Sequence, residues 1–258
     1  VDSDTILSDG AVSAAVAHFM NSDADLLAVM PRRIGDCVVE KLIFPFIDWA
    51  AFCWMPMKRA HNSQNPHLSA TFGQFMLFNR DAYYAIGGHS AIRTPPLDDI
   101  ALGRGIKKKG LKWILLDGVN SVQVLPYKGN ADAFMSVSRS VFPFFSNRFN
   151  ILGLLQVFLI LGLLSTLLLM LAFWPLFTVT ANMMSYPQEP VALAISTLTI
   201  AMIAIPWMVV CRKFNHSSLA VLFYPLSISL IVIVGIHSIL TYGRGVTNWK
   251  NRRIFSPK

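Results

Sequence analysis

The carboxy-terminal part of this chain of 258 residues is almost free of charged side chains. Forty consecutive residues at 149–188 contain no Lys, Arg, Asp or Glu, and two further stretches without them run from Pro190 to Cys211 and from Phe214 to Gly243. Each stretch is long enough to cross a bilayer as an α-helix, which needs about 20 apolar residues. The sequence therefore predicts about three membrane-spanning segments within residues 151–243, behind a part that has the charges and turns of a water-soluble domain.

Charge is distributed unevenly between these two parts. The net charge is +8, but residues 1–148 hold 15 Lys and Arg against 13 Asp and Glu, whereas residues 149–258 hold 7 against 1. The basic excess thus lies beside the apolar stretches, where it suits anionic lipid headgroups. A nucleic-acid-binding protein would carry a basic stripe on its soluble part, so no nucleic acid is expected as a partner.

The first 130 residues alternate between helical and extended patterns, which is typical of an α/β layered domain. The expected strands are short apolar runs, at 25–30, 75–78, 111–116 and 119–125. The expected helices cover 8–20, 81–86 and 98–109. Val12, Val16 and Phe19 recur at helical spacing and predict the buried face of the first helix. The glycines at 87–88 and 110 are expected to end the other two helices, because glycine adopts the left-handed backbone conformation found there.

Two aromatic segments are expected close to the membrane. Residues 38–57 form a helical region whose core, Leu42–Met57, carries a single charge at Asp48. A helix in the membrane interface and a buried core helix explain this region equally well. Residues 131–150 combine phenylalanines with Arg139 and Arg148, which predicts an amphipathic interface helix directly before the first apolar stretch.

Two pairs of acidic residues are the candidates for chemistry. Asp2 and Asp4 stand at i and i+2, in what is expected to be a loop after a strand. Mg²⁺ and Mn²⁺ prefer such oxygen ligands, although a pair of this kind is on its own more often a solvated turn. Asp98 and Asp99 are expected at a helix N-terminus, where the helix dipole favours carboxylates. One of them suffices as a cap, so the other is a candidate general base.

Several basic side chains are expected to be structural. The run Lys107–Lys109 at a helix C-terminus is read as a solvated face, and His89 is read as a loop residue that could touch a substrate. No acidic residue stands near His216 or His237 in the sequence, so both are interpreted as structural.

Four segments together resemble the membrane-anchored family 2 glycosyltransferases of GT-A fold. They are VDSDT at 1–5, GQFMLFNRDAYYAIGGH at 73–89, PLDDIALGRGIKKKG at 96–110 and WKNR at 249–252. In this order they are similar to the family's D-x-D motif, its acceptor-side strand, helix and Gly-Gly turn, its E-D helix with Asp98 in place of Glu, and its W-K-G-R tail. The resemblance covers most of residues 1–130 and the tail, and the bacterial carotenoid- and hopanoid-associated members look most similar.

The resemblance implies a metal-dependent hexosyl transfer. Asp4, assisted by Asp2, would ligate a Mg²⁺ or Mn²⁺ ion that bridges the diphosphate of a nucleotide-sugar, with a UDP-sugar as the expected donor. Asp99 would deprotonate the acceptor hydroxyl, which would attack the anomeric carbon in line and invert its configuration. The expected acceptor is a lipid or a lipid-linked group, so the product would be a glycolipid.

The resemblance also implies substrate contacts. Gln74, Gly87 and Gly88 would shape the pocket, and Asp98 would help to bind the substrate. Arg139 stands where the processive polysaccharide synthases of this family carry a Q/R-x-x-R-W motif, but the Gln and the Trp are absent. This departure disfavours processive synthesis, and Arg139 is interpreted either as a contact to the diphosphate or as a cation facing lipid headgroups.

The expected architecture is a partial GT-A domain over residues 1–130, then the interface helix at 131–150, the spans at 151–243 and a basic tail at 244–258. The nucleotide-binding half that precedes D-x-D in this family is missing, so the chain alone is expected to bind its donor poorly. A cytoplasmic donor implies a multi-pass protein of the cell membrane with a cytoplasmic catalytic domain. Three crossings would then place the basic tail outside, against the positive-inside rule, so the number of crossings stays open. The competing class is a non-catalytic membrane scaffold or degenerate homologue.

Overall fold

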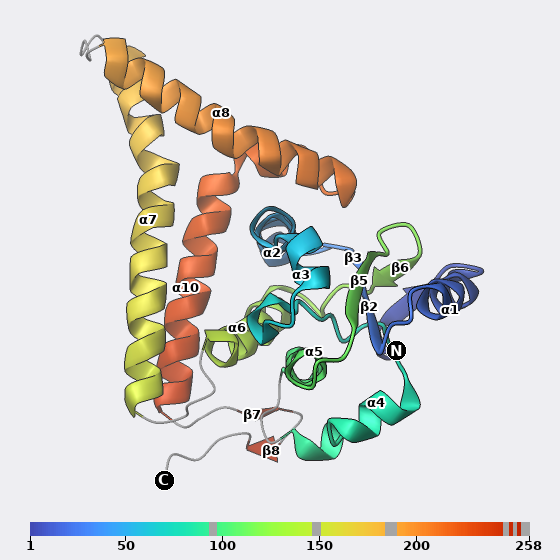
Figure 1. Cartoon of the computed structure of the whole chain (residues 1–258). Helices are drawn as coiled ribbons and strands as arrows, with labels where there is room; N and C mark the ends of the chain where they lie inside the picture. Colours follow the sequence, from blue (N-terminus) through green and yellow to red (C-terminus); the bar gives the residue numbers. More distant parts are fainter. Residues whose placement is uncertain (93–96, 146–150, 184–189, 245–247, 250–251, 254–258) are drawn as a thin grey trace. The chain divides into compact units, whose positions relative to one another are not determined.

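The computed structural model describes the chain except for residues 93–96, 146–150, 184–189, 245–247, 250–251 and 254–258 (Figure 1). Its described part is a mixed α/β structure, mostly helical, with small sheets and three long apolar helices. Two compact units form, one from Val1–Asp36 and Ala50–Tyr127 and the other from Cys37–Trp49 and Lys128–Lys258. Helix α2 (Val38–Trp54) contributes residues to both units.

The central sheet of the first unit is built around a buried strand. Strand β2 (Leu26–Met30) runs antiparallel to β4 (Met76–Phe78) on one side and parallel to β5 (Trp113–Asp117) on the other. All five residues of β2 are buried, as a continuous apolar run in a central strand requires. The strands expected at 25–30, 75–78 and 111–116 are therefore confirmed, with shifts of one or two residues at their ends.

A second small sheet places β6 (Val122–Val124) between β1 (Thr5–Leu7) and β3 (Arg32–Arg33). Strand β6 is shorter than the expected run at 119–125, because Ser121 and Val122 donate backbone hydrogen bonds to the carbonyl of Gly118 and so form a turn. Asp2 and Asp4 were expected in a loop after a strand. In the structure their segment forms a turn that leads into strand β1.

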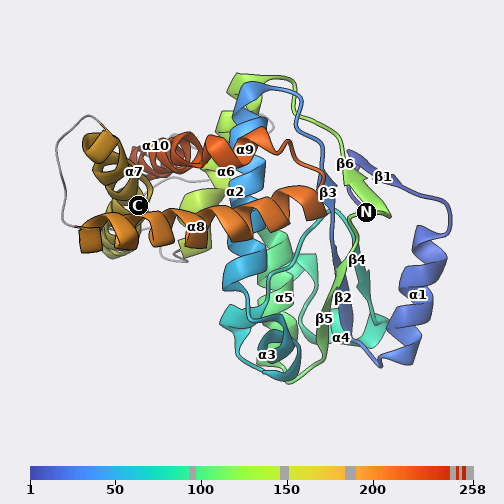
Figure 2. The ribbon, with the colours of Figure 1, turned by 90° about the horizontal axis from the view of Figure 1, so that it is seen from above.

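Helix α1 (Ala11–Asn21) confirms the first expected helix and, of its expected buried face, only Phe19, which packs partly buried against the core. Figures 1 and 2 show α1 and α5 (Asp98–Lys108) on opposite sides of the central sheet. Ala11 and Ala15 are the buried residues of α1, and Ala15 packs in a core with Leu27, Val29, Phe75 and Val122. Val12 and Val16 are exposed, so the prediction was wrong for both. The small alanine face allows α1 to approach the sheet closely.

Glycines end α5 and α4 (Arg80–Ala85) as the sequence predicts. The backbone φ angles are 80° at Gly87, 55° at Gly88 and 72° at Gly110. The side chain of Asn79 caps the start of α4 by accepting from the backbone N–H of Asp81, at 2.9 Å, and of Ala82. Strong signals at both ends explain why this short helix was predictable.

Lys107 on α5 departs from the expected solvated face. Its side chain is buried and donates to the carbonyl oxygens of Ala60 and, at 2.8 Å, of Ser63, at the end of helix α3 (Met57–Asn62). The ammonium also lies 4.7 Å from the centre of the Trp113 ring. Burial lowers the pKa of Lys107. The last carbonyls of a helix lack partners within it, and Lys107 satisfies them here.

Among the described residues, three helices of the second unit are long and apolar enough to cross a membrane. They are α7 (Ile151–Met183), α8 (Pro190–Lys213) and α10 (Tyr224–Gly243). The short helix α9 (Leu219–Leu222) lies in the chain between α8 and α10. The most apolar windows of the three long helices have mean hydropathies of 2.6, 2.1 and 1.9. This confirms three hydrophobic segments and fits membrane association. Helix α7 packs against both α8 and α10.

Helix α6 (Asn130–Phe145) precedes the apolar helices in the chain. Its range agrees with most of the interface helix expected at 131–150, of which residues 146–150 lie outside the described part. Ala133, Ser138 and Phe142 are its buried side, and the Phe142 ring stacks on Tyr242 of α10 at 4.7 Å between ring centres. The tail forms two short strands, β7 (Asn248–Trp249) and β8 (Arg252–Arg253). Lys250 and Asn251 of the tail motif lie outside the described residues.

A buried carboxylate–imidazole pair joins distant parts of the second unit. Asp48 Oδ2 lies 2.7 Å from His216 Nε2, and the Asp48 side chain is completely buried. The interpretation of His216 as lacking an acidic partner was wrong, because Asp48 stands 168 residues earlier in the chain. Ile43, Phe44 and Phe46 of the same helix are also buried, which favours the core-helix alternative for this part of residues 38–57.

Candidate functional site

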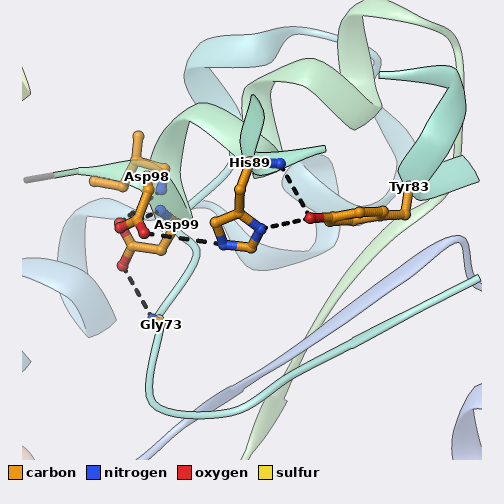
Figure 3. Close-up of polar contacts among 6 residues, drawn as sticks. Gly73, Tyr83, His89, Asp98 and Asp99 are labelled. Carbon is orange, nitrogen blue, oxygen red and sulfur yellow. Dashed lines mark hydrogen bonds and ion pairs between the residues drawn. The ribbon is translucent and has the colours of Figure 1, made fainter. Parts of the chain in front are cut away.

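Asp99, in the first turn of α5, is held against a loop that enters β4. Its Oδ2 atom accepts the backbone N–H of Gly73 at 3.0 Å, and its Oδ1 atom accepts the N–H of Ile100 at 2.7 Å (Figure 3). A Cβ placed on Gly73 would lie 3.4 Å from the Cβ of Asp99. The loop therefore lies within van der Waals distance of the Asp99 side chain.

The environment of Asp99 makes its carboxyl group a weak acid. The pKa of Asp99 is raised from 3.8 to about 7, with burial as the largest cause. The negative charges of Asp98 and Asp2 contribute to this increase, while the hydrogen bonds from Ile100 and Gly73 oppose it. A carboxylate that exchanges its proton near neutral pH is suited to general base catalysis.

Asp2 lies beside the same loop. Its backbone N–H donates to the carbonyl of Gln74 at 3.2 Å, and its own carbonyl accepts from the N–H of Thr5 at 3.2 Å, which forms a turn before β1. A Cβ on Gly73 would lie 3.5 Å from Asp99 Oδ2 and 3.7 Å from Asp2 Oδ2. Two carboxylates that are far apart in the sequence therefore approach Gly73 together.

Asp4 is positioned by its backbone. Its carbonyl accepts the N–H of Leu125 at 2.9 Å, after the end of β6, and its side chain is exposed. In the described part of the chain, no group of three or more His, Cys, Asp or Glu side chains could hold a metal ion. Mg²⁺ is commonly bound by only one or two protein carboxylates, with water and substrate phosphates as its remaining ligands. A site with two carboxylates is compatible with this kind of binding. The side chains of Asp2 and Asp4 are carboxylates, and their role as metal ligands stays a prediction.

The Gly-Gly turn is shaped around Tyr83. A Cβ on Gly88 would lie only 2.5 Å from the Tyr83 ring, and a Cβ on Gly87 would lie 2.7 Å from the Cβ of Ala91. Both positions also have positive φ angles, so side chains are disfavoured on two grounds. Local packing and backbone conformation therefore explain why glycine stands at both positions. Their expected contact with substrate stays a prediction.

Tyr83 and His89 form a polar array that reaches Asp98, and sequence reasoning missed Tyr83. The Tyr83 hydroxyl lies 2.7 Å from His89 Nδ1 and accepts the backbone N–H of His89 at 3.1 Å. On the other side of the ring, His89 Nε2 lies 3.9 Å from Asp98 Oδ2. Figure 3 shows the imidazole between the phenol and the acidic pair. A tyrosine six residues before the histidine, across a Gly-Gly turn, was the available signal.

Arg139 belongs to the second unit, on α6. Its guanidinium donates to the Ser136 hydroxyl at 2.8 Å, and its carbonyl accepts from the Tyr242 hydroxyl at 2.9 Å. Asp2, Gln74, Asp98 and Asp99 are all in the first unit. The site described here is therefore built from first-unit residues, and the diphosphate and headgroup roles of Arg139 both remain predictions.

Comparisons with protein-family models, with curated protein sequences and with solved structures find no match to this chain. The similarity to family 2 glycosyltransferases accordingly rests on the four sequence segments, and the chemistry of the site rests on the residues around Gly73.

Proposed function

We propose that this chain is part of a membrane-anchored, inverting glycosyltransferase with a partial GT-A domain. It transfers a hexose from a nucleotide-sugar, with a UDP-sugar as the first candidate, to the hydroxyl of a lipid or lipid-linked acceptor. The observation that carries the proposal is the Asp99 carboxylate, held by the N–H groups of Gly73 and Ile100 with the carboxylate of Asp2 beside the same Gly73, in surroundings that raise its pKa to about 7. A base with this pKa is half ionised at neutral pH and can accept the proton of an attacking hydroxyl.

The residues around Asp99 have distinct roles in this proposal. The N–H of Gly73 orients the Asp99 carboxylate toward the acceptor. Gln74 and the turn at Gly87 and Gly88 line the substrate site, and Asp98, which is exposed, binds substrate. A hydroxyl attacks the anomeric carbon from the face opposite the diphosphate while Asp99 takes its proton, so the sugar changes configuration.

A divalent ion, Mg²⁺ or Mn²⁺, is the proposed cofactor, held by Asp2 and Asp4. When bound, it neutralises the negative charge that develops on the departing nucleoside diphosphate. The negative charge of Asp2 acts on Asp99, so a cation held by Asp2 would be close enough to favour the ionised base. The metal and the base would therefore be coupled in one site.

The apolar helices give the proposed reaction its setting. Three helices long enough to cross a bilayer keep the chain at the membrane, where a lipid acceptor is concentrated. Because nucleotide-sugars are made in the cytoplasm, the proposal places the first unit on the cytoplasmic face of the cell membrane. Processive polymer synthesis is disfavoured, because Ser136 and Ser140 flank Arg139 where that chemistry calls for Gln and Trp.

The test is the Asp99→Asn variant. Asparagine is nearly isosteric but cannot accept the proton, so transfer of labelled sugar from a panel of UDP-sugars to membrane lipids should fall about 100-fold or more. The matched control is Asp81→Asn, which changes an exposed carboxylate in the first turn of α4 and should leave transfer unchanged. Chelation of divalent ions should abolish transfer, and added Mg²⁺ or Mn²⁺ should restore it.

A membrane scaffold would behave differently in this experiment. It would tolerate Asp99→Asn and retain its association with membranes and partners. Equal transfer by the Asp99→Asn variant and the parent would eliminate Asp99 as the base and would favour the scaffold.

A further inference from the structure

The imidazole of His89 has a defined orientation. The carboxylate of Asp98, which can only accept, faces His89 Nε2 at 3.9 Å and favours the tautomer with the ring hydrogen on Nε2. In this tautomer the Tyr83 hydroxyl donates to Nδ1 at 2.7 Å and accepts the backbone N–H of His89 at 3.1 Å. Nδ1 is then an acceptor, and in the neutral ring the hydrogen sits on Nε2. Tyr83 therefore aims a ring N–H away from itself, toward Asp98.

The backbone around His89 is adapted to this arrangement. At Gly88 a Cβ would lie 2.5, 2.6 and 2.8 Å from three atoms of the Tyr83 side chain, including its hydroxyl oxygen. The φ angle of 55° at Gly88 lies in a region that other residues rarely adopt. The turn thus keeps the Tyr83 phenol in contact with the His89 imidazole. A histidine without a role in the loop would not require this arrangement.

His89 and Asp98 face each other without satisfying each other. The 3.9 Å between Nε2 and Oδ2 is too long for a hydrogen bond. The other carboxylate oxygen of Asp98 accepts the N–H of Asp99 at 3.1 Å. The side chains of His89 and Asp98 are 51% and 56% exposed. A ring N–H and a carboxylate oxygen therefore stand together in the open, directly beside the residue proposed as the base.

We propose that His89 Nε2 and Asp98 Oδ2 together bind one hydroxyl of the acceptor, next to the hydroxyl that reacts. A hydroxyl is both a donor and an acceptor, so a single oxygen between the two atoms accepts from Nε2–H and donates to Oδ2. An ammonium group cannot accept and a carboxylate cannot donate, so this pair selects hydroxyls. The acceptor is thus a lipid whose headgroup carries at least two hydroxyls, such as a sugar or another polyol.

This inference rests on the proposed glycosyl transfer for its place in a reaction, but its binding step is measurable alone. The probe is monoglucosyl diacylglycerol, and its control is diacylglycerol, which has one hydroxyl. The chain is labelled with ¹⁵N-histidine and placed in lipid nanodiscs that contain either lipid, with and without UDP and Mg²⁺. The His89 signals are identified, among those of six histidines, by their loss in His89→Gln.

The glucosyl lipid should shift the Nε2 signal of His89 and diacylglycerol should not. Tyr83→Phe removes both hydrogen bonds to His89 but keeps the ring, and it should weaken the response about 10-fold in lipid concentration. His18→Gln, at an exposed position of α1, should leave the response unchanged. Thermal unfolding of each variant shows whether it is folded. An unchanged His89 signal with the glucosyl lipid, under both nucleotide conditions, overturns the inference.

Transfer assays separate this inference from the proposed function. In His89→Gln and Tyr83→Phe, KM for the glucosyl lipid should rise about 10-fold while kcat changes little, whereas Asp99→Asn should lose kcat. A His89 response to the glucosyl lipid, together with equal sugar transfer by Asp99→Asn and the parent, would leave the hydroxyl-binding pair standing and refute Asp99 as the base of a glycosyltransferase. Sugar transfer with an unchanged KM for the glucosyl lipid in His89→Gln would leave the glycosyltransferase standing and refute the hydroxyl-binding pair.

Discussion

Asp48 in the second unit and Asp99 in the first are carboxylates with opposite surroundings. In the second unit, Asp48 is paired with His216 at 2.7 Å. In the first unit, the charges that act on Asp99 are those of Asp98 and Asp2, both negative, and the pKa of Asp99 rises to about 7. Burial of a carboxylate is costly unless a partner compensates its charge. The paired acid serves packing, whereas the acid among like charges is left ready to exchange a proton.

This contrast separates a structural carboxylate from a candidate base by its neighbours. Both residues occupy helices and both are acidic, so their identity alone does not distinguish them. The distinction comes from the sign of the nearby charge and from the hydrogen bonds that each carboxylate accepts.

Removal of one partner of the buried pair should have the largest effect on stability. Asp48→Ala leaves His216 without its carboxylate, and breaking a buried pair costs about 3–5 kcal/mol. Denaturant unfolding of the protein in detergent micelles, followed by circular dichroism, measures the loss. Asp81→Ala, at an exposed position, should change stability by less than about 0.5 kcal/mol.

A double-mutant cycle sharpens this prediction. If Asp48 and His216 act as a unit, the cost of Asp48→Ala and His216→Ala together should be well below the sum of their separate costs. Strictly additive costs would show that Asp48 and His216 do not stabilise each other. Asp48 would then no longer serve as the example of a paired carboxylate in the comparison with Asp99.

Asp99→Asn should instead remove a pH-dependent loss of stability in the first unit. The pKa of Asp99 is raised on folding, so the folded chain binds the proton more tightly than the unfolded chain, and stability falls as the pH rises from about 4 to about 7. The penalty is complete above pH 7 and absent below pH 4. The full shift corresponds to about 4 kcal/mol, and partial exposure reduces this to about 2 kcal/mol.

Unfolding at pH 5 and at pH 8 tests that sign. The parent chain should lose stability between these values by more than Asp99→Asn does. Equal pH dependence in the two proteins would mean that Asp99 titrates in the ordinary range of a carboxyl group, which would remove the main support for its role as a base.

Lys107 offers the same comparison for a cation, with a smaller expected effect. Lys107→Met leaves the carbonyls of Ala60 and Ser63 without their donor and should cost about 1–3 kcal/mol. Lys108→Met, one residue along the same helix and exposed, should cost less than about 0.5 kcal/mol. Equal costs would mean that the buried ammonium adds nothing beyond its hydrocarbon chain.

Much of the local structure was predictable because its signals are local. The glycines at 87–88 and 110 end α4 and α5, as residues that adopt positive φ angles should. The apolar run that forms β2 was recognisable without knowledge of its neighbours. The face of α1 was not, since burial of Ala15 rather than Val16 depends on how closely the helix approaches the sheet.

The candidate site was predictable in part. Asp2 and Asp99 were both singled out by their residue type and spacing, but the sequence paired Asp2 with Asp4 rather than with Asp99. The contact through Gly73 and Gln74 arises only when the turn before β1 meets the loop before β4. His89 was read as a loop residue that could touch a substrate, but its orientation was not predictable, because the phenol that orients it comes from the preceding helix.

By itself, the sequence determined that this chain has three apolar segments long enough to span a membrane and an α/β part with two acidic pairs, because hydropathy, glycine positions and residue spacing act over short distances. Only the tertiary structure decided which charges meet. The pairing of Asp48 with His216, the burial of Lys107 and the approach of Asp2 to Asp99 all join residues distant in sequence, and electrostatic and desolvation energies depend on distances in space, which no local pattern encodes.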